Sequence, residues 1–177
     1  MKFKILLLTI LFGVISKVHA QQDIPGSYNY IVKIGQQAPD FKTTIANGKP
    51  FHLADLQGKV IMLQFTASWC SVCRKEMPHI EQEIWQTHKN DPDFVLYAVD
   101  WAEPAAKVSA FSEAVPVSYP FLMDPHGTIF HRYAGPKAGI TRNVIIGKDG
   151  KIVFMTRLYK VDEFNQMKVV INQLLEK

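Results

Sequence analysis

The chain has two cysteines, Cys70 and Cys73, which are separated by two residues in the segment Trp69-Cys70-Ser71-Val72-Cys73. An apolar run ends at Phe65 and a helical pattern follows, so we expect Cys70 at the start of a helix. Unpaired N–H groups and the positive end of the helix dipole favour a thiolate there and lower its pKa. Cys73, about one turn later, can then attack a mixed disulfide formed at Cys70. The pair predicts thiol-disulfide exchange, with Cys70 as nucleophile and Cys73 as resolving thiol.

Two other uses of the cysteine pair compete with this interpretation. A zinc site usually needs four Cys, His or carboxylate ligands, and the sequence has no second Cys-x-x-Cys and no closely spaced His pair. A purely structural disulfide usually closes a longer loop, because a short loop removes little entropy from the unfolded chain. Both alternatives stay open, but the sequence favours a redox pair with no metal and no cofactor.

The N-terminus has the pattern of a secretory signal. Two lysines precede the apolar run 5–15, and Val18-His19-Ala20 fits cleavage by signal peptidase after Ala20. We therefore expect residues 1–20 to be a signal peptide. A retained membrane anchor is the alternative, although the run is shorter than the ~20 residues that span a bilayer. Export places the dithiol in the periplasm or another extracytoplasmic compartment, away from cytosolic thioredoxin and glutathione.

Composition indicates one globular domain with no nucleic-acid partner. The formal net charge of +4 includes three lysines of the predicted signal, and removing them takes 20 basic residues to 17 against 16 acidic ones. After the signal, 157 of the 177 residues remain, enough for one domain with its own core. We expect residues 21–33 to form an N-terminal extension and residues 34–177 to form a single, monomeric domain.

Hydrophobic periodicity and turn residues predict alternating strands and helices. The expected elements are a hairpin at 41–45 and 50–53, a strand at 59–65, a helix at 71–89 kinked by Pro78, a strand at 94–99, a helix at 105–114, a hairpin at 144–146 and 152–154, and a final helix from an Asp162 cap to Leu174. This order predicts an α/β fold, in which a central mixed β-sheet carries helices on both faces and an N-terminal β-hairpin extension.

Four motifs together resemble a known family. They are Gly35-x-x-Ala38-Pro39-Asp40-Phe41, Gly58-Lys59-Val60-Ile61, Trp69-Cys70-x-x-Cys73-x-x-Glu76-x-Pro78 and the stretch 139–153. They resemble the exported TlpA-like and ResA-like branch of thioredoxin-fold thiol-disulfide oxidoreductases over residues 34–177. The resemblance implies a thioredoxin-like fold and a dithiol that reduces protein disulfides, with a membrane thiol-disulfide protein as electron donor. It also implies that Glu76 lies near the dithiol and helps to set its proton chemistry.

Three positions depart from the family pattern. Thr141 stands where these enzymes commonly have a cis-proline, and we expect a trans peptide there because a non-proline cis bond costs ~3 kcal/mol. Gln64 stands where thioredoxin has a buried aspartate. Ser71-Val72 replaces the familiar dipeptides between the cysteines, and since this dipeptide tunes the potential, the direction of electron flow stays open.

Several residues near the dithiol are predicted to support it, each with a plain structural alternative. Trp69 would shield the disulfide and offer a flat surface to a partner. Ile140 and Thr141 would pair through their main chains with an extended substrate peptide. Glu76 would alter the pKa of Cys73 or move protons, although an ordinary helix carboxylate fits as well. Gln64 would satisfy buried backbone groups.

Two other functional classes stay open. A thiol peroxidase would need Pro-x-x-x-Thr-x-x-Cys, yet Leu63 and Ala67 occupy the Pro and Thr positions relative to Cys70. A non-catalytic binding module on the same scaffold is the second class, because a fold does not secure a function. The intact cysteine pair argues against this second class.

Overall fold

The computed structural model describes residues 28–176, so the predicted signal peptide lies outside the described residues. Five strands form the central sheet, in the order β5 (Phe121–Asp124), β4 (Phe94–Trp101), β3 (Val60–Thr66), β6 (Arg142–Ile146) and β7 (Ile152–Arg157). Strands β3, β4 and β5 run parallel, while β6 is antiparallel to both β3 and β7. The predicted mixed sheet is therefore confirmed.

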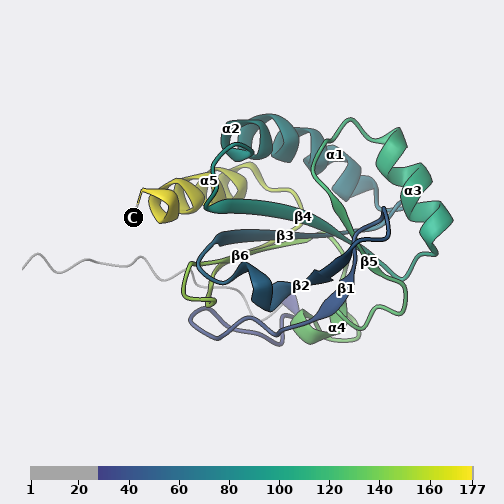
Figure 1. Cartoon of the computed structure of the whole chain (residues 1–177), viewed down its shortest axis with the longest axis horizontal. Coiled ribbons are helices and arrows are strands. Elements are labelled where there is room, and N and C mark those ends of the chain that lie inside the picture. Colours follow the sequence, from purple (N-terminus) through teal and green to yellow (C-terminus); the bar gives the residue numbers. More distant parts are fainter. Residues whose placement is uncertain (1–27, 177) are drawn as a thin grey trace, which may run out of the picture.

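The sheet has a different cover on each face (Figure 1). One face carries α1 (Ser71–Ile80), η3 (Glu81–Trp85), α2 (Gln86–His88), α3 (Ala105–Ala114) and α5 (Val161–Leu175). The other face carries α4 (Phe130–Tyr133), η2 (Leu53–Leu56) and the hairpin of β1 (Lys42–Thr44) and β2 (Pro50–His52). Every residue of β3 is buried, as expected for a strand covered on both faces. The predicted helices on both faces and the N-terminal hairpin are confirmed.

Three short elements were not predicted from the sequence, namely η2, β5 and α4. Strand β5 has only four residues and follows Pro120, and α4 is a single turn between two loops, so neither is long enough to give a clear periodic signal. The expected helix 71–89 is also divided. Pro78 has no N–H to donate within the helix, and the chain continues after Ile80 as the π-helical turn η3.

The start of the last helix also differs from the prediction. We expected Asp162 to cap it, but Lys160 is the N-cap residue and makes no side-chain capping bond. Asp162 instead lies in the first turn, where its charge complements the helix dipole.

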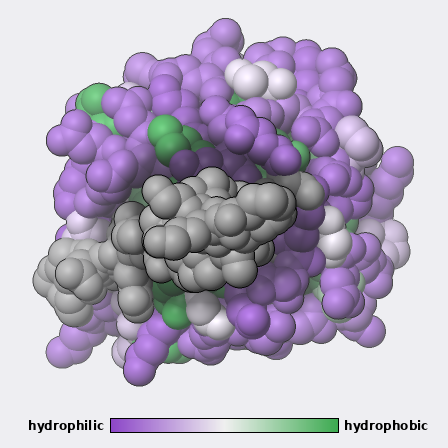
Figure 2. Space-filling model, turned by 90° about the vertical axis from the view of Figure 1, so that its left-hand side faces the viewer, coloured by the Kyte–Doolittle hydropathy of each residue, from purple (hydrophilic) through white to green (hydrophobic). Residues whose placement is uncertain are grey.

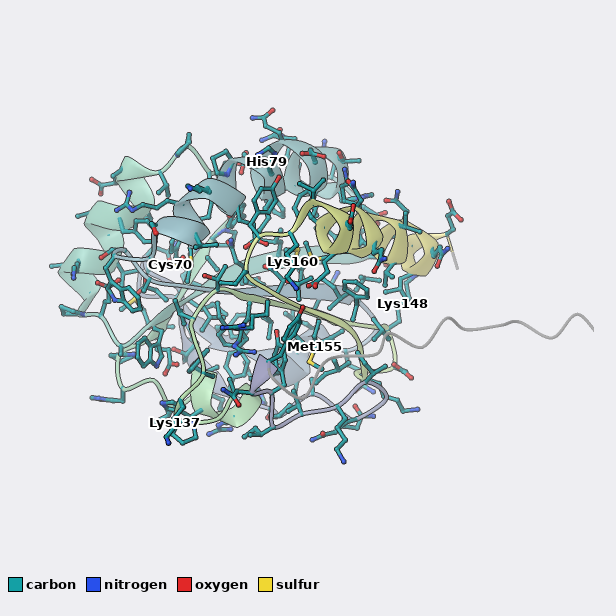
Figure 3. The ribbon with its side chains drawn as sticks, turned by 180° about the vertical axis from the view of Figure 1, so that it is seen from behind. Cys70, His79, Lys137, Lys148, Met155 and Lys160 are labelled. Atoms are coloured by element: carbon teal, nitrogen blue, oxygen red, sulfur yellow. A yellow bond between two sulfur atoms is a disulfide. The ribbon has the colours of Figure 1, made fainter. Side chains whose placement is uncertain are left out.

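The strand directions determine which edge of the sheet lies near the two cysteines. The C-terminal ends of β3 and β4 lie together with the first residue of β6, because Phe65 pairs with Arg142 and Thr66 pairs with Asp100. In Figure 3, Cys70 lies toward this end of the sheet and Lys148 toward the other. Side chains that leave β3, β4 and β6 at this edge therefore meet near the dithiol.

The face of the molecule seen in Figure 2 is mostly hydrophilic, with only small apolar spots among the described residues. Within residues 28–176, none of the helices combines the length and apolarity needed to cross a membrane.

Candidate functional site

Cys70 and Cys73 form a disulfide at the start of α1, with 5.3 Å between their Cα atoms. Cys70 is the N-cap residue, and its Sγ accepts a hydrogen bond of 3.2 Å from the backbone N–H of Cys73. This N–H is one of the donors that a helix start leaves unpaired. Cys70 keeps 6% of its surface exposed and Cys73 only 1%. The outer sulfur thus lies at the helix start and its partner lies behind it.

Thr141 lies directly against the disulfide. Its Oγ1 is 3.2 Å from Sγ of Cys70 and 3.4 Å from Sγ of Cys73, and the side chain is buried. No peptide bond within residues 28–176 is cis, so the bond between Ile140 and Thr141 is trans, as the sequence predicts. The position at which the sequence analysis expected a proline in related enzymes therefore presents a hydroxyl to both sulfurs.

Glu76 follows Cys73 by one helical turn and is 1% exposed. Its Oε1 accepts a 2.7 Å hydrogen bond from Nδ2 of Asn143, which also donates to Oγ1 of Thr156 at 2.9 Å. Burial raises the pKa of Glu76 to about 7, although the amides of Asn143 and Gln64 oppose the shift. The carboxyl group therefore titrates near neutral pH within one helical turn of the dithiol.

Gln64 belongs to the same buried polar layer below α1. It pairs with Asn143 across β3 and β6, and its Oε1 accepts a 2.8 Å hydrogen bond from the hydroxyl of Tyr119. Its amide lies close enough to Glu76 to lower the pKa of that carboxyl. The structure therefore places the Gln64 side chain beside a carboxyl group and a tyrosine, where we had expected it to satisfy backbone groups.

A second acidic group lies under the loop that leads into Cys70. Glu103 accepts hydrogen bonds from the N–H and the hydroxyl of Ser68. It also forms an ion pair of 2.7 Å with Lys107. Beside it, both carboxyl oxygens of Asp100 are buried. Burial, followed by the negative charges of Glu103 and Asp124, raises the pKa of Asp100 to about 8. Glu103 thus holds the loop that leads into Cys70. Asp100 is, after Glu76, a second buried carboxyl group that titrates near neutral pH.

The predicted surface residues differ in accessibility. Trp69 is 58% exposed next to Cys70, and its ring meets the edge of Trp101 at a centroid distance of 6.0 Å. Ile140 is buried. Trp69 therefore offers an apolar surface beside the outer sulfur, whereas Ile140 can offer only its main chain.

The structure brings Cys70, Cys73, Glu76, Thr141 and Gln64 to one edge of the sheet. The sequence analysis did not identify other polar residues of this edge, among them the half-buried Ser68 and the buried Thr66, Asp100, Glu103, Tyr119, Asn143 and Thr156. The available signal was the pairing of β3 with β6, which sets Asn143 opposite Gln64 once the register is known. Within residues 28–176, no cluster of three or more His, Cys, Asp or Glu side chains could hold a metal ion.

Comparison with known proteins agrees with this geometry. The family model described as Redoxin matches residues 33–171. The thiol-disulfide oxidoreductase ResA of a Bacillus cereus strain is 31% identical over 152 residues, which are 85% of this chain and 84% of that protein.

Two solved structures are similar as well. A Bacteroides thetaiotaomicron protein described as a candidate protein disulfide isomerase is 53% identical with a TM-score of 0.82, over 85% of this chain and 94% of that one. A secreted disulfide oxidoreductase of Mycobacterium tuberculosis is 25% identical with a TM-score of 0.59, over 73% and 95% of the two chains. The chain therefore belongs to the Redoxin family, as a ResA-like thiol-disulfide oxidoreductase with the thioredoxin fold.

Proposed function

We propose that this protein is an exported reductant of protein disulfides, with Cys70 as the attacking thiol and Cys73 as the resolving thiol. The observation that carries the proposal is the position of the disulfide at the N-terminus of α1. There the outer sulfur already accepts a backbone N–H and retains some exposure, while the inner sulfur has almost none. A thiolate at Cys70 gains from both the N–H and the helix dipole.

The reaction proceeds in two exchanges. The Cys70 thiolate attacks one sulfur of the substrate disulfide, a bond to that sulfur forms, and the second substrate sulfur leaves as a thiolate that takes up a proton. Cys73 then loses its proton and attacks Sγ of Cys70, which releases the first substrate sulfur as a thiolate. Two electrons pass to the substrate and Cys70–Cys73 is left as a disulfide, which a membrane thiol-disulfide donor reduces again.

Glu76 takes the proton that Cys73 must lose in the second exchange. The pKa of about 7 that burial gives this carboxyl supports the role, because a general base works best when its pKa is near the working pH. Its place one turn after Cys73, on the same side of α1, supports it as well. The proton then returns to solvent when Glu76 ionises.

The substrate binds at the edge of the sheet where Trp69 is exposed. The Trp69 ring gives an apolar contact for the protein that carries the disulfide, and the main chain of Ile140 and Thr141 pairs with its extended segment. Both positions adjoin the outer sulfur, which supports their assignment to the docking surface.

The proposed location is the periplasm or another extracytoplasmic space. The pattern of residues 1–20 supports export, as does the likeness to a secreted disulfide oxidoreductase. Residues 21–33 then form an N-terminal extension to a monomeric domain that spans residues 34–177.

Disulfide isomerisation is a second candidate function. The 53% identity to a protein described as a candidate protein disulfide isomerase favours it. An isomerase renews native activity in scrambled ribonuclease without net consumption of a reductant. A reductase instead transfers electrons to insulin in proportion to the dithiol supplied, so the two assays separate these functions.

A Cys73→Ser variant tests the proposed chemistry. Without a resolving thiol, Cys70 should remain joined to its substrates as mixed disulfides that survive denaturing gels and disappear on reduction. The Cys70→Ser variant is the matched control and should trap none. Recovery of only non-covalent complexes from Cys73→Ser would contradict the proposal and favour a binding module.

A further inference from the structure

The hydroxyl of Thr141 has an unusual set of partners. Its two hydrogen-bond partners within residues 28–176 are the two sulfurs, at 3.2 and 3.4 Å. Disulfide sulfurs carry no hydrogen, so in this state the single hydrogen of the hydroxyl is donated to one sulfur or the other. The nearly equal distances mean that a small rotation of one side chain moves the hydrogen bond from Cys70 to Cys73.

The backbone fixes the position of this hydroxyl. The carbonyl of Thr141 accepts a 3.0 Å hydrogen bond from the N–H of Leu158, and the next residue begins β6. Nε of Arg142 donates to the carbonyl of Gly139 at 2.8 Å, and the guanidinium packs 4.3 Å from the ring centre of Tyr30. The loop that carries Thr141 is therefore held on both sides, so the hydroxyl is preorganised toward the sulfurs.

Burial increases the contribution of this hydrogen bond to the stability of a thiolate. Thr141 is 4% exposed and Cys73 is 1% exposed, so little water reaches the inner sulfur. A thiolate formed there has few donors to replace its hydration, and a buried charge without donors is strongly unfavourable. The backbone N–H of Cys73 serves Sγ of Cys70. The side-chain donor that reaches the inner sulfur is Thr141.

We propose that Thr141 is a catalytic residue whose hydroxyl donates a hydrogen bond first to the Cys70 thiolate and then to the Cys73 thiolate. The inference rests on the proposed function, because it assigns Cys70 to the first exchange and Cys73 to the second. It goes beyond that function by giving the side chain at the proline position a direct part in both exchanges. A proline there has no hydroxyl and makes neither contact.

The hydrogen bond follows the negative charge through the reaction. In the reduced protein the hydroxyl stabilises the Cys70 thiolate. When Cys70 has formed its bond to the substrate sulfur, that charge leaves with the other substrate sulfur. Cys73 then gives its proton to the base, and the hydroxyl turns to the new thiolate until the Cys70–Cys73 bond forms and the first substrate sulfur departs. Thr141 itself keeps its proton throughout.

The aromatic disulfide DTNB separates the two exchanges. In the Cys73→Ser background, Cys70 attacks DTNB and releases one thionitrobenzoate, so the absorbance at 412 nm reports the first exchange alone. With Cys73 present, its attack on Cys70 releases the second thionitrobenzoate. Thr141→Val removes the hydroxyl, Thr141→Ser keeps it, and Thr141→Ala is a smaller replacement that serves if valine disturbs folding.

Thr66→Val is the matched control. Thr66 lies at the end of the neighbouring strand, is also buried, and directs its hydroxyl to Sδ of Met77 at 3.8 Å. Its loss removes a buried hydroxyl from the same edge of the sheet without removing a donor to the cysteine sulfurs.

Thr141→Val should raise the apparent pKa of the first exchange by about one unit, which corresponds to about 1.4 kcal/mol and lowers the rate about tenfold at pH values well below the parent pKa. Its rate at pH 10, where Cys70 is ionised in either protein, should stay within about twofold of the parent. Release of the second thionitrobenzoate should slow about tenfold at pH 7. Thr141→Ser and Thr66→Val should keep the parent pKa and both rates.

Two results would overturn the proposal. The first is an unchanged apparent pKa and an unchanged second release in Thr141→Val or Thr141→Ala. The second is an equal fall of rate at every pH without a pKa shift, which indicates displaced sulfurs. Failure of the proposed function looks different: the Cys73→Ser protein with Thr141 intact would then release no thionitrobenzoate.

Discussion

Replacing Glu76 with glutamine should change stability in a way that depends on pH. The carboxyl is 1% exposed, and burial raises its pKa from an ordinary 4.5 to about 7. The folded protein therefore binds more protons than the unfolded chain between these two pH values. Its free energy of unfolding must then fall as the pH rises through this window, because ionising the carboxyl costs more in the folded state.

The size of the effect follows from the shift. A difference of about 2.5 units at 1.36 kcal/mol per unit corresponds to about 3 kcal/mol between pH 4 and pH 8. A glutamine at this position keeps an oxygen that can accept the hydrogen bond from Asn143 but never ionises. Glu76→Gln should therefore match the parent near pH 4 and exceed its stability by up to about 3 kcal/mol at pH 8.

Urea unfolding of the oxidised protein at several pH values measures this difference directly. Glu113→Gln is the matched control, since Glu113 lies exposed on α3 and its replacement should change stability by less than about 0.5 kcal/mol at any pH. A constant difference between Glu76→Gln and the parent from pH 4 to pH 8 would refute the raised pKa of this carboxyl.

Three further substitutions test other parts of the site. Asn143→Ala removes the 2.7 Å donor to Glu76 and should raise the pKa of that carboxyl further, which the infrared bands of the carboxylate can follow. The same substitution should lower the free energy of unfolding in urea by about 1–3 kcal/mol. Glu103→Gln removes the charge that binds Lys107 and should slow insulin reduction by loosening Ser68; parental activity would contradict this role. Leu63→Ala opens a cavity in β3 and should cost about 2–5 kcal/mol, measured by thermal unfolding, with the active-site thiolate pKa unchanged.

The sequence predicted the parts of the fold that have strong local patterns. The largely apolar strand β3, the helix that starts after Cys70 and the hairpin of β6 and β7 each had a clear periodicity or turn signal. Short elements without such signals were missed, as β5 and α4 show. In these elements the neighbouring strands and the core determine the conformation more than the local residues do.

Contacts between site residues that are close in sequence were predictable, whereas contacts made by strand pairing across the sheet were less so. The spacing of Cys70, Cys73 and Glu76 on one helix gave their proximity directly. Asn143, in β6, and Thr141, in the loop just before β6, reach the same place from almost seventy residues later, and only the pairing of β3 with β6 brings them there. Asp100 was missed for a related reason, because β4 extends two residues beyond the predicted strand and carries it into the interior.

The most direct test of the account is to find which thiol reacts first. The reduced protein is treated with iodoacetamide over a range of pH, and peptide mass mapping assigns the modified cysteine. We expect Cys70 to be alkylated first, with an apparent pKa well below the ordinary thiol value of about 8.5, while Cys73 stays protected in the folded protein. Earlier modification of Cys73, or an apparent pKa of 8.5 or higher at Cys70, would contradict the assignment of Cys70 as the attacking thiol.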